Sequence, residues 1–146
     1  MARKIISACS GNVEGKTIAI LGVTFKPNTD DMRDAPSLDI IPALQLAGAN
    51  IRVYDPEGMH EAKQLLKNIC WCDSAYEAMD NADAVTILTE WNQFRGLNLN
   101  RIKSLLTAPI MIDLRNIYNP KEMESAGFVY SCVGRGEIKL GKTNEK

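Results

Sequence analysis

Short apolar runs alternate along the chain with segments whose apolar residues recur at helical spacing. The first run, residues 17–21, ends at a glycine, and residues 38–47 then show helical spacing before a second run at 51–55. Runs of this kind are typical of buried strands, and their alternation with helices favours βαβ units and a mainly parallel sheet. Because the runs are apolar almost throughout, we expect helices on both faces of the sheet.

The expected elements cover most of the chain, whose 146 residues suit one globular domain. We expect strands at residues 17–21, 51–55, 69–72, 84–88, 110–113 and 128–133. The expected helices lie at residues 3–10, 38–47, 61–68, 74–81 and 99–106, the second of them N-capped by Ser37. The sequence therefore predicts an α/β fold with a Rossmann-like, doubly wound, mainly parallel sheet of five to six strands flanked by helices.

Charge and hydropathy argue against two classes of partner. Lys and Arg number 17 and Asp and Glu 18, giving a net charge of -1, whereas duplex-binding domains normally carry a basic excess. No apolar run approaches the roughly 20 residues that span a bilayer, and residues 1–11 lack the apolar core of a signal peptide. We therefore expect no nucleic-acid partner, no membrane association and a cytoplasmic location.

The four cysteines give no sign of a metal site. Cys70 and Cys72 are separated by one residue, whereas zinc ligands are usually separated by two to four, and the single histidine, His60, lies in a different expected element. We expect no metal, and we interpret Cys9, Cys70, Cys72 and Cys132 as buried free thiols of a cytoplasmic protein.

Two nucleotide-binding patterns are incomplete. The loop after the first strand should carry Gly-x-Gly-x-x-Gly for a standard dinucleotide site, yet it has only Gly22, with Thr24 and Pro27 at the other glycine positions. Asp55 resembles the acid that binds a ribose, although Asp also favours the turn that follows. Residues 136–143 match a phosphate loop, but too little chain follows for the helix it needs, so we expect a flexible tail at 134–146.

Three cations are expected near one crevice. Ligands of doubly wound sheets bind beyond the carboxyl ends of the strands, and Lys26 and Arg33 lie in the loop after the first strand while Arg115 follows the fifth. Acidic residues in the same loop are partly explained by the nearby helix N-terminus. Three cations in a chain of net charge -1 indicate an anionic ligand, with phosphates as the natural choice.

Four ordered motifs resemble a known family. Residues 22–37, GVTFKPNTDDMRDAPS, resemble the signature loop in the C-terminal domain of the UDP-glucose/GDP-mannose dehydrogenase family. Tyr-Asp-Pro at 54–56, Thr-Glu-Trp at 89–91 and Asp-Leu-Arg-Asn at 113–116 fall where that family has matching motifs. The residues of these motifs are more similar to those of the UDP-glucose 6-dehydrogenase branch than to those of relatives that oxidise GDP-mannose or UDP-N-acetylmannosamine.

The resemblance implies a function and a set of roles. The family oxidises the C6 alcohol of the sugar to a carboxylate with NAD as hydride acceptor, through a covalent step on a cysteine of a central region. The C-terminal domain mostly holds the UDP-sugar, here UDP-glucose or its product UDP-glucuronate. By position, Phe25, Lys26 and Arg115 would bind the substrate, and Arg33 would reach towards NAD. Glu90 and Trp91 would shape the site wall or the uridine pocket.

The chain lacks other parts of the family pattern. The N-terminal glycine-rich cofactor motif and the Gly-Gly-x-Cys stretch of the nucleophile are missing, so we expect no catalytic residue here and no dehydrogenase activity by this chain alone. We interpret residues 1–12 as the end of an interdomain helix and residues 13–133 as the UDP-sugar-binding domain. The expected partners are the N-terminal and central domains of a parent that forms a homodimer or a larger oligomer.

Three alternatives stay open. A stand-alone nucleotide- or coenzyme-A-binding regulatory module would share the fold and bind its ligand without further domains. A phospho-receiver domain would use clustered acids such as Asp30 and Asp31 to hold Mg²⁺, but these follow the first strand at a distance, and Arg115 stands where a lysine is expected. A pure interaction module would leave the three cations without a role.

Overall fold

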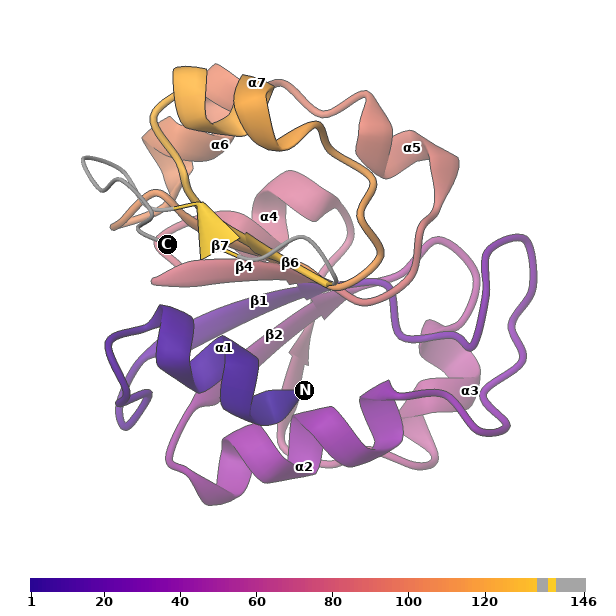
Figure 1. Cartoon of the computed structure of the whole chain (residues 1–146). Coiled ribbons are helices and arrows are strands. Elements are labelled where there is room, and N and C mark those ends of the chain that lie inside the picture. Colours follow the sequence, from indigo (N-terminus) through magenta and orange to yellow (C-terminus); the bar gives the residue numbers. More distant parts are fainter. Residues whose placement is uncertain (134–136, 139–146) are drawn as a thin grey trace.

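The computed structural model describes residues 1–133 and 137–138. In this described part, seven strands form one sheet in the order β3-β2-β1-β4-β5-β6-β7 (Figure 1). The first six strands are parallel and β7 runs antiparallel to β6. The strands are β1 Thr17–Leu21, β2 Asn50–Tyr54, β3 Ile69–Trp71, β4 Ala84–Ile87, β5 Ile110–Asp113, β6 Val129–Cys132 and β7 Glu137–Ile138. The order of the parallel strands is that of dinucleotide-binding doubly wound sheets, so the predicted Rossmann-like fold is confirmed.

Helices cover both faces of the sheet, as Figure 1 shows. Alternate residues of β1 point to opposite faces, so Ile18 and Ile20 join one core while Ala19 and Leu21 join the other. All four side chains are fully buried, which explains why the strand is apolar without interruption. The first core lies under α1 Ala2–Ala8, α2 Ser37–Leu46 and α3 Met59–Lys63, and the second under α4 Ala75–Met79, α5 Asn92–Arg95, α6 Leu99–Leu105 and α7 Pro120–Ser125.

Some short elements differ from those predicted. The third helix occupies residues 59–63 rather than 61–68, and α5, α7 and β7 were not predicted. Ser37 is the first residue of α2 rather than its N-cap, and its hydroxyl donates instead to the Val23 carbonyl at 2.6 Å. That prediction was wrong because the hydroxyl ties the start of the helix to the loop after β1.

The tail, membrane-spanning helices and metal-binding groups were also considered in the sequence. The tail expected at 134–146, with its phosphate-loop pattern, lies outside the described residues except for the two that form β7. No helix of the described part is both long and apolar enough to cross a bilayer. The same part contains no group of three or more His, Cys, Asp or Glu side chains that could hold a metal ion.

Candidate functional site

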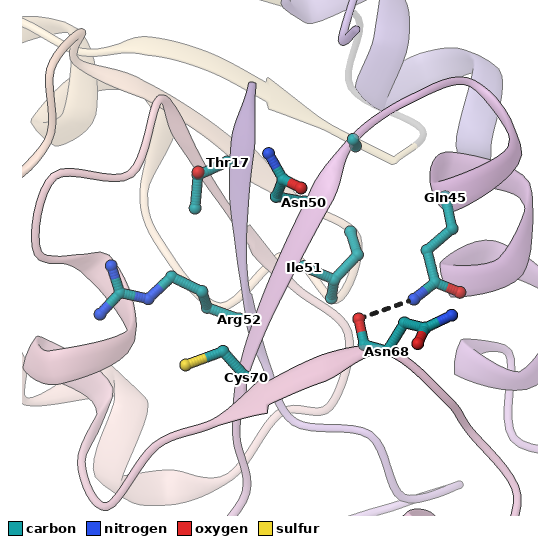
Figure 2. Close-up of a pocket in the computed structure, with 8 residues that line it drawn as sticks. Thr17, Gln45, Asn50, Ile51, Arg52, Asn68 and Cys70 are labelled. Carbon is teal, nitrogen blue, oxygen red and sulfur yellow. Dashed lines mark hydrogen bonds between the residues drawn. The ribbon is translucent and has the colours of Figure 1, made fainter. Parts of the chain in front are cut away.

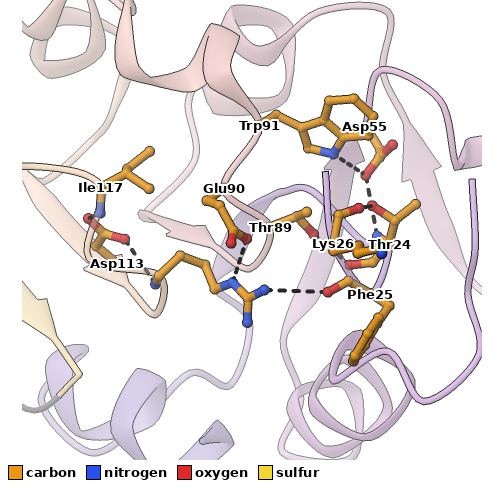
Figure 3. A network of polar contacts seen from close by, with 10 residues as sticks. Thr24, Phe25, Lys26, Asp55, Thr89, Glu90, Trp91, Asp113 and Ile117 are labelled. Carbon is orange, nitrogen blue, oxygen red and sulfur yellow. Dashed lines mark hydrogen bonds and ion pairs between the residues drawn. The ribbon is translucent and has the colours of Figure 1, made fainter. Parts of the chain in front are cut away.

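The crevice expected of this fold lies between the loops that follow β1 and β4. These two strands are neighbours at the centre of the sheet, and the chain continues from β1 to one face and from β4 to the other. This reversal is the switch point at which doubly wound sheets bind ligands. The motifs at 22–37, 54–56, 89–91 and 113–116 all follow strands that end at this edge (Figure 3).

The deep end of the crevice is filled by the chain itself. A Cβ atom on Gly22, whose φ is +88°, would lie 2.6 Å from the Thr89 Cβ and 2.9 Å from the Thr89 backbone nitrogen. The Thr89 hydroxyl donates to the Thr24 carbonyl at 2.7 Å, so the loop after β4 packs directly against the loop after β1. A dinucleotide-binding fold keeps this space for a pyrophosphate beside its glycines. The close contact explains why Gly22 is required here while the other two glycines of that pattern are absent.

Asp55 lies behind the crevice rather than facing it. The residue is fully buried, and its Oδ2 accepts hydrogen bonds from the Val23 N–H at 2.7 Å and from the Trp91 indole N–H at 3.2 Å. Its Oδ1 accepts from the backbone N–H groups of Glu57 and Gly58 at 2.9 and 2.7 Å. Both oxygens are therefore engaged by the chain, and the similarity to a ribose-binding acid is not reflected in the geometry. The indole of Trp91 is likewise buried and directed at Asp55 (Figure 3).

Arg115 and Phe25 meet at the mouth of the crevice. The Arg115 Nε donates to Glu90 Oε1 at 2.8 Å, and its Nη2 lies 3.4 Å from the Phe25 carbonyl oxygen. The Arg115 side chain is 28% exposed, so part of the guanidinium faces solvent. Burial raises the pKa of Glu90, but hydrogen bonds from its own backbone N–H and from Arg115 outweigh burial and bring that pKa below its ordinary value. Glu90 is thus an ionised carboxylate that binds the Arg115 side chain, which differs from the expected role in the wall of the site.

Lys26 is an exposed cation of the loop after β1. Phe25 and Lys26 are both exposed, and the Lys26 side chain forms no ion pair with any described residue. The Lys26 backbone is fixed, because its carbonyl accepts the Thr24 hydroxyl at 3.0 Å. Phe25 is fixed as well, since its N–H donates to the Asp31 carbonyl at 3.0 Å. The loop therefore presents the Lys26 side chain from an ordered backbone, directly after Phe25, whose carbonyl lies 3.4 Å from the Arg115 Nη2.

Arg33 pairs with Asp31 of its own loop and faces solvent. Its Nε and Nη2 donate to the two carboxylate oxygens of Asp31 at 3.0 and 2.9 Å, and its side chain is 89% exposed. The guanidinium and the nearby Lys26 bring the pKa of Asp31 down to about 2. Arg33 also lines a hollow of about 530 Å³ between its own loop, α2 and α3. The structure thus brings Phe25 and Arg115 together, places Lys26 close enough to Asp31 to lower its pKa, and exposes Arg33.

A second hollow, of about 520 Å³, lies at the opposite edge of the sheet, where β1, β2 and β3 begin (Figure 2). Several of its polar groups already have partners, although the buried Arg52 Nε has none among the described residues. The Gln45 amide donates to the Lys67 and Asn68 carbonyls at 2.7 and 3.2 Å. The Arg52 guanidinium donates to the Glu77 and Asp80 carbonyls, each at 2.6 Å. We therefore locate the candidate site at the crevice and not here.

A family model described as the UDP-glucose/GDP-mannose dehydrogenase family, UDP binding domain, matches residues 19–120. The chain belongs to this family. The matched span begins in β1 and ends at the start of α7, so it contains the crevice and all four loops that border it. The resemblance seen in the sequence motifs is thereby confirmed.

Individual relatives agree with this family assignment. The chain is 50% identical over 135 residues to a UDP-glucose 6-dehydrogenase of Rhizobium meliloti, and 42% identical over 137 residues to the UDP-glucose 6-dehydrogenase TuaD of Bacillus subtilis. These alignments cover 92% and 93% of this chain but only 31% and 30% of the relatives. A solved UDP-glucose dehydrogenase from Pyrobaculum islandicum superposes with a TM-score of 0.73 at 27% identity, covering 89% of this chain and 28% of that one. The chain thus spans about a third of the length of the curated relatives it matches.

The contacts of Thr89, Asp55 and Glu90 were not predicted from the sequence. The available signal was the single Gly22 after β1, since a lone glycine at a switch point indicates close approach of another backbone. Nothing in the sequence specified which neighbour it approaches.

Proposed function

We propose that this chain is the UDP-sugar-binding domain of a cytoplasmic, NAD-dependent dehydrogenase that oxidises UDP-glucose to UDP-glucuronate. Support comes from the family match and from identity of up to 50% to UDP-glucose 6-dehydrogenases over nearly the whole chain. Residues 13–133 form the binding domain in this proposal, and residues 1–12 form the end of a helix that leads from a preceding domain. The preceding domains are its partners, in a parent that is a homodimer or a larger oligomer.

One observation carries the proposal, namely that the deep end of the crevice is closed while its mouth is cationic. The Thr24–Thr89 contact occupies the place of a pyrophosphate against β1. The exposed Lys26 follows Thr24 by two residues, and the partly exposed Arg115 guanidinium lies 3.4 Å from the Phe25 carbonyl between them. These two groups would hold the diphosphate of a UDP-sugar, because charge-assisted hydrogen bonds to phosphate oxygens are strong. The exposed ring of Phe25 would flank the nucleotide.

Among the described residues, we assign one outward-facing side chain, that of Arg33, to a contact with NAD. Arg33 is exposed and offers a guanidinium to a phosphate, although it must first share or release Asp31. When bound by the parent, NAD supplies the hydride acceptor. Within this chain, Cys9, Cys72 and Cys132 are buried, and burial raises the pKa of the Cys9 and Cys72 thiols.

Cys70 is exposed, so the expectation that all four thiols are buried was wrong for this residue. It lines the hollow of Figure 2 rather than the crevice. No thiol is therefore placed to form a covalent intermediate at the crevice. We expect no UDP-glucose-dependent NADH formation by this chain alone, and measurable formation would contradict that expectation.

The test is an amide NMR titration with UDP, UDP-glucose and NAD⁺, repeated with Lys26→Ala. UDP and UDP-glucose should shift the amides around Lys26 and Arg115. Loss of one charge-assisted phosphate contact should weaken binding by about 1.5–3 kcal/mol, or roughly ten- to hundredfold. Lys121→Ala, which removes an exposed lysine on α7, is the matched control and should bind as the wild type does.

The outcomes separate the remaining interpretations. Binding of NAD⁺ without UDP would favour a stand-alone cofactor-binding module. Binding of UDP with equal affinity by wild type and Lys26→Ala would contradict the site assignment. No response to any of these ligands would contradict the proposal that this chain binds the UDP-sugar by itself.

A further inference from the structure

Three loops of the crevice meet on one buried carboxylate. Besides the Val23 N–H, the Thr24 N–H points at Asp55 Oδ2, at 3.4 Å, so the loop after β1 supplies two donors. The turn after β2 supplies the N–H groups of Glu57 and Gly58, and the loop after β4 supplies the Trp91 indole. We call these six residues the Asp55 clasp. A buried carboxylate is costly to leave unpaired, so all five donors favour one arrangement of the three loops.

The residues of the clasp are closely packed, so an added methyl group at Gly58 would clash with Thr24. A Cβ atom on Gly58 would lie 2.3 Å from the Thr24 Cγ2 and 3.3 Å from Asp55 Oδ1. The turn after β2 is therefore in direct contact with the loop after β1. The Thr89 hydroxyl bond to the Thr24 carbonyl adds a second tie to the loop after β4. Thr24 thus lies between the two neighbouring loops and contacts both.

The clasp ends where the proposed ligand contacts begin. Val23 and Thr24 directly precede Phe25 and Lys26, so their position determines where the Lys26 ammonium emerges. The Phe25 carbonyl in turn lies within reach of the Arg115 guanidinium. A displacement of the loop after β1 would therefore move Lys26 and loosen Arg115 together.

We propose that Asp55 and Trp91 are positioning residues for the UDP-sugar. They touch no ligand, and they act by holding the segment from Val23 to Lys26 against the loop after β4 before the ligand binds. Preorganisation of this kind raises affinity because the loop need not be ordered on binding. The inference rests on the proposed function for its ligand, but the state of the loop can be measured without any ligand.

The test replaces Trp91 by Phe, which keeps a buried aromatic ring and removes the indole N–H. The chain offers a matched control, because its other tryptophan, Trp71, lies on β3 and makes no hydrogen bond with Asp55. Amide hydrogen exchange is measured in the absence of ligand, with Ala19 in β1 as the internal reference for global opening. UDP affinity is then measured by calorimetry at a temperature where every variant is folded.

We expect Trp91→Phe to accelerate exchange of the Val23 and Thr24 amides by about tenfold relative to Ala19. UDP binding should weaken by about tenfold, as expected when one hydrogen bond to a carboxylate is lost from the site's support. Trp71→Phe should change neither quantity. A purely structural role would lower the urea midpoint of Trp91→Phe and leave the UDP affinity unchanged, which would overturn the inference.

Asp55→Asn provides a second variant with the same shape. One carboxamide end is an N–H₂ group that cannot accept, so at least two donors of the clasp lose their partner. Exchange should accelerate in both the loop after β1 and the turn after β2. Unchanged amide exchange in both variants would show that Asp55 and Trp91 do not hold these loops, whatever the UDP affinity of the variants. If the variants loosen these loops but the wild-type chain does not bind UDP, the proposed function is refuted and the clasp stands as a constraint on the loops alone.

Discussion

Buried carboxylates organise the loops of this domain. Asp113 ends β5 as Asp55 follows β2, and both are fully buried. The Asp113 Oδ2 accepts from the backbone N–H groups of Ile117 and Tyr118 at 2.9 and 3.0 Å and from the Tyr130 hydroxyl at 2.6 Å. Burial of a carboxylate is unfavourable unless several donors replace water. Each aspartate therefore fixes the loop that supplies its donors, and Arg115 lies in the loop that Asp113 fixes.

The pair formed by Asp31 and Arg33 predicts a pH effect at the scale of single residues. The pKa of Asp31 falls from its ordinary 3.8 to about 2, first because of the hydrogen bonds from Arg33. A pKa that is lower in the folded state than in the unfolded state contributes stability above about pH 4, and that contribution is lost as the pH falls towards 2. Arg33→Ala should return the pKa of Asp31 towards 3.8, as measured by carbon-detected NMR titration of its carboxyl carbon.

Arg3→Ala is the control for this titration, because Arg3 is an exposed residue of α1 that forms no ion pair with any described residue. It should leave the pKa of Asp31 low. A pKa that also stays near 2 in Arg33→Ala would show that another group depresses it.

The junction between β1 and its loop depends on a glycine, and two glycines of the chain form a matched pair for testing it. Gly22 and Gly15 both have positive φ, +88° and +75°, but a Cβ would meet Thr89 at Gly22 and nothing within 4 Å at Gly15. Gly15→Ala should cost about 1–2 kcal/mol of unfolding free energy for the left-handed conformation alone. Gly22→Ala should cost about 1–3 kcal/mol more, because the added methyl group forces the two loops apart.

Urea unfolding of the wild type and the two variants measures this difference, with comparable m-values as the sign that the unfolding transition is unchanged. Equal losses for the two variants would contradict the close contact between Gly22 and Thr89. A Gly22→Ala chain that retains its stability would do so as well.

β1 and β5 were predictable because all but the first residue of each is buried. The predicted bounds of β1 and β5 equal the observed ones, Thr17–Leu21 and Ile110–Asp113. The short helix α5 was missed because it has four residues and depends on the burial of Phe94, a tertiary contact. For α7 a local signal existed, since Asn119 caps the helix and Pro120 occupies its first turn.

The candidate site was predictable in its location but not in its internal contacts. Strand order places the loops after β1, β4 and β5 at one edge, so the proximity of Phe25 and Arg115 followed from the fold class. The bond from Arg115 to Glu90 and the outward turn of Arg33 depend on loop conformation and side-chain rotamers. Periodicity and spacing carry no information on either.

Considered as a whole, the molecule has a fold usually associated with dinucleotide binding. The loops after β1 and β4 contact each other at the place where such folds bind the pyrophosphate. The sheet order is retained, but the contacts of Gly22, Thr24 and Thr89 fill the centre of the switch point. The remaining cationic surface lies further out, on Lys26 and Arg115. A nucleotide bound by this domain must therefore lie across the mouth of the crevice.

A crystal structure of the chain with UDP would show where the diphosphate lies. We expect the diphosphate within hydrogen-bonding distance of the Lys26 Nζ and the Arg115 guanidinium, with the contact between Thr24 and Thr89 intact beneath it. A diphosphate bound against the backbone of Gly22, with that contact opened, would contradict the account. A nucleotide bound in the hollow where β1, β2 and β3 begin would contradict it equally.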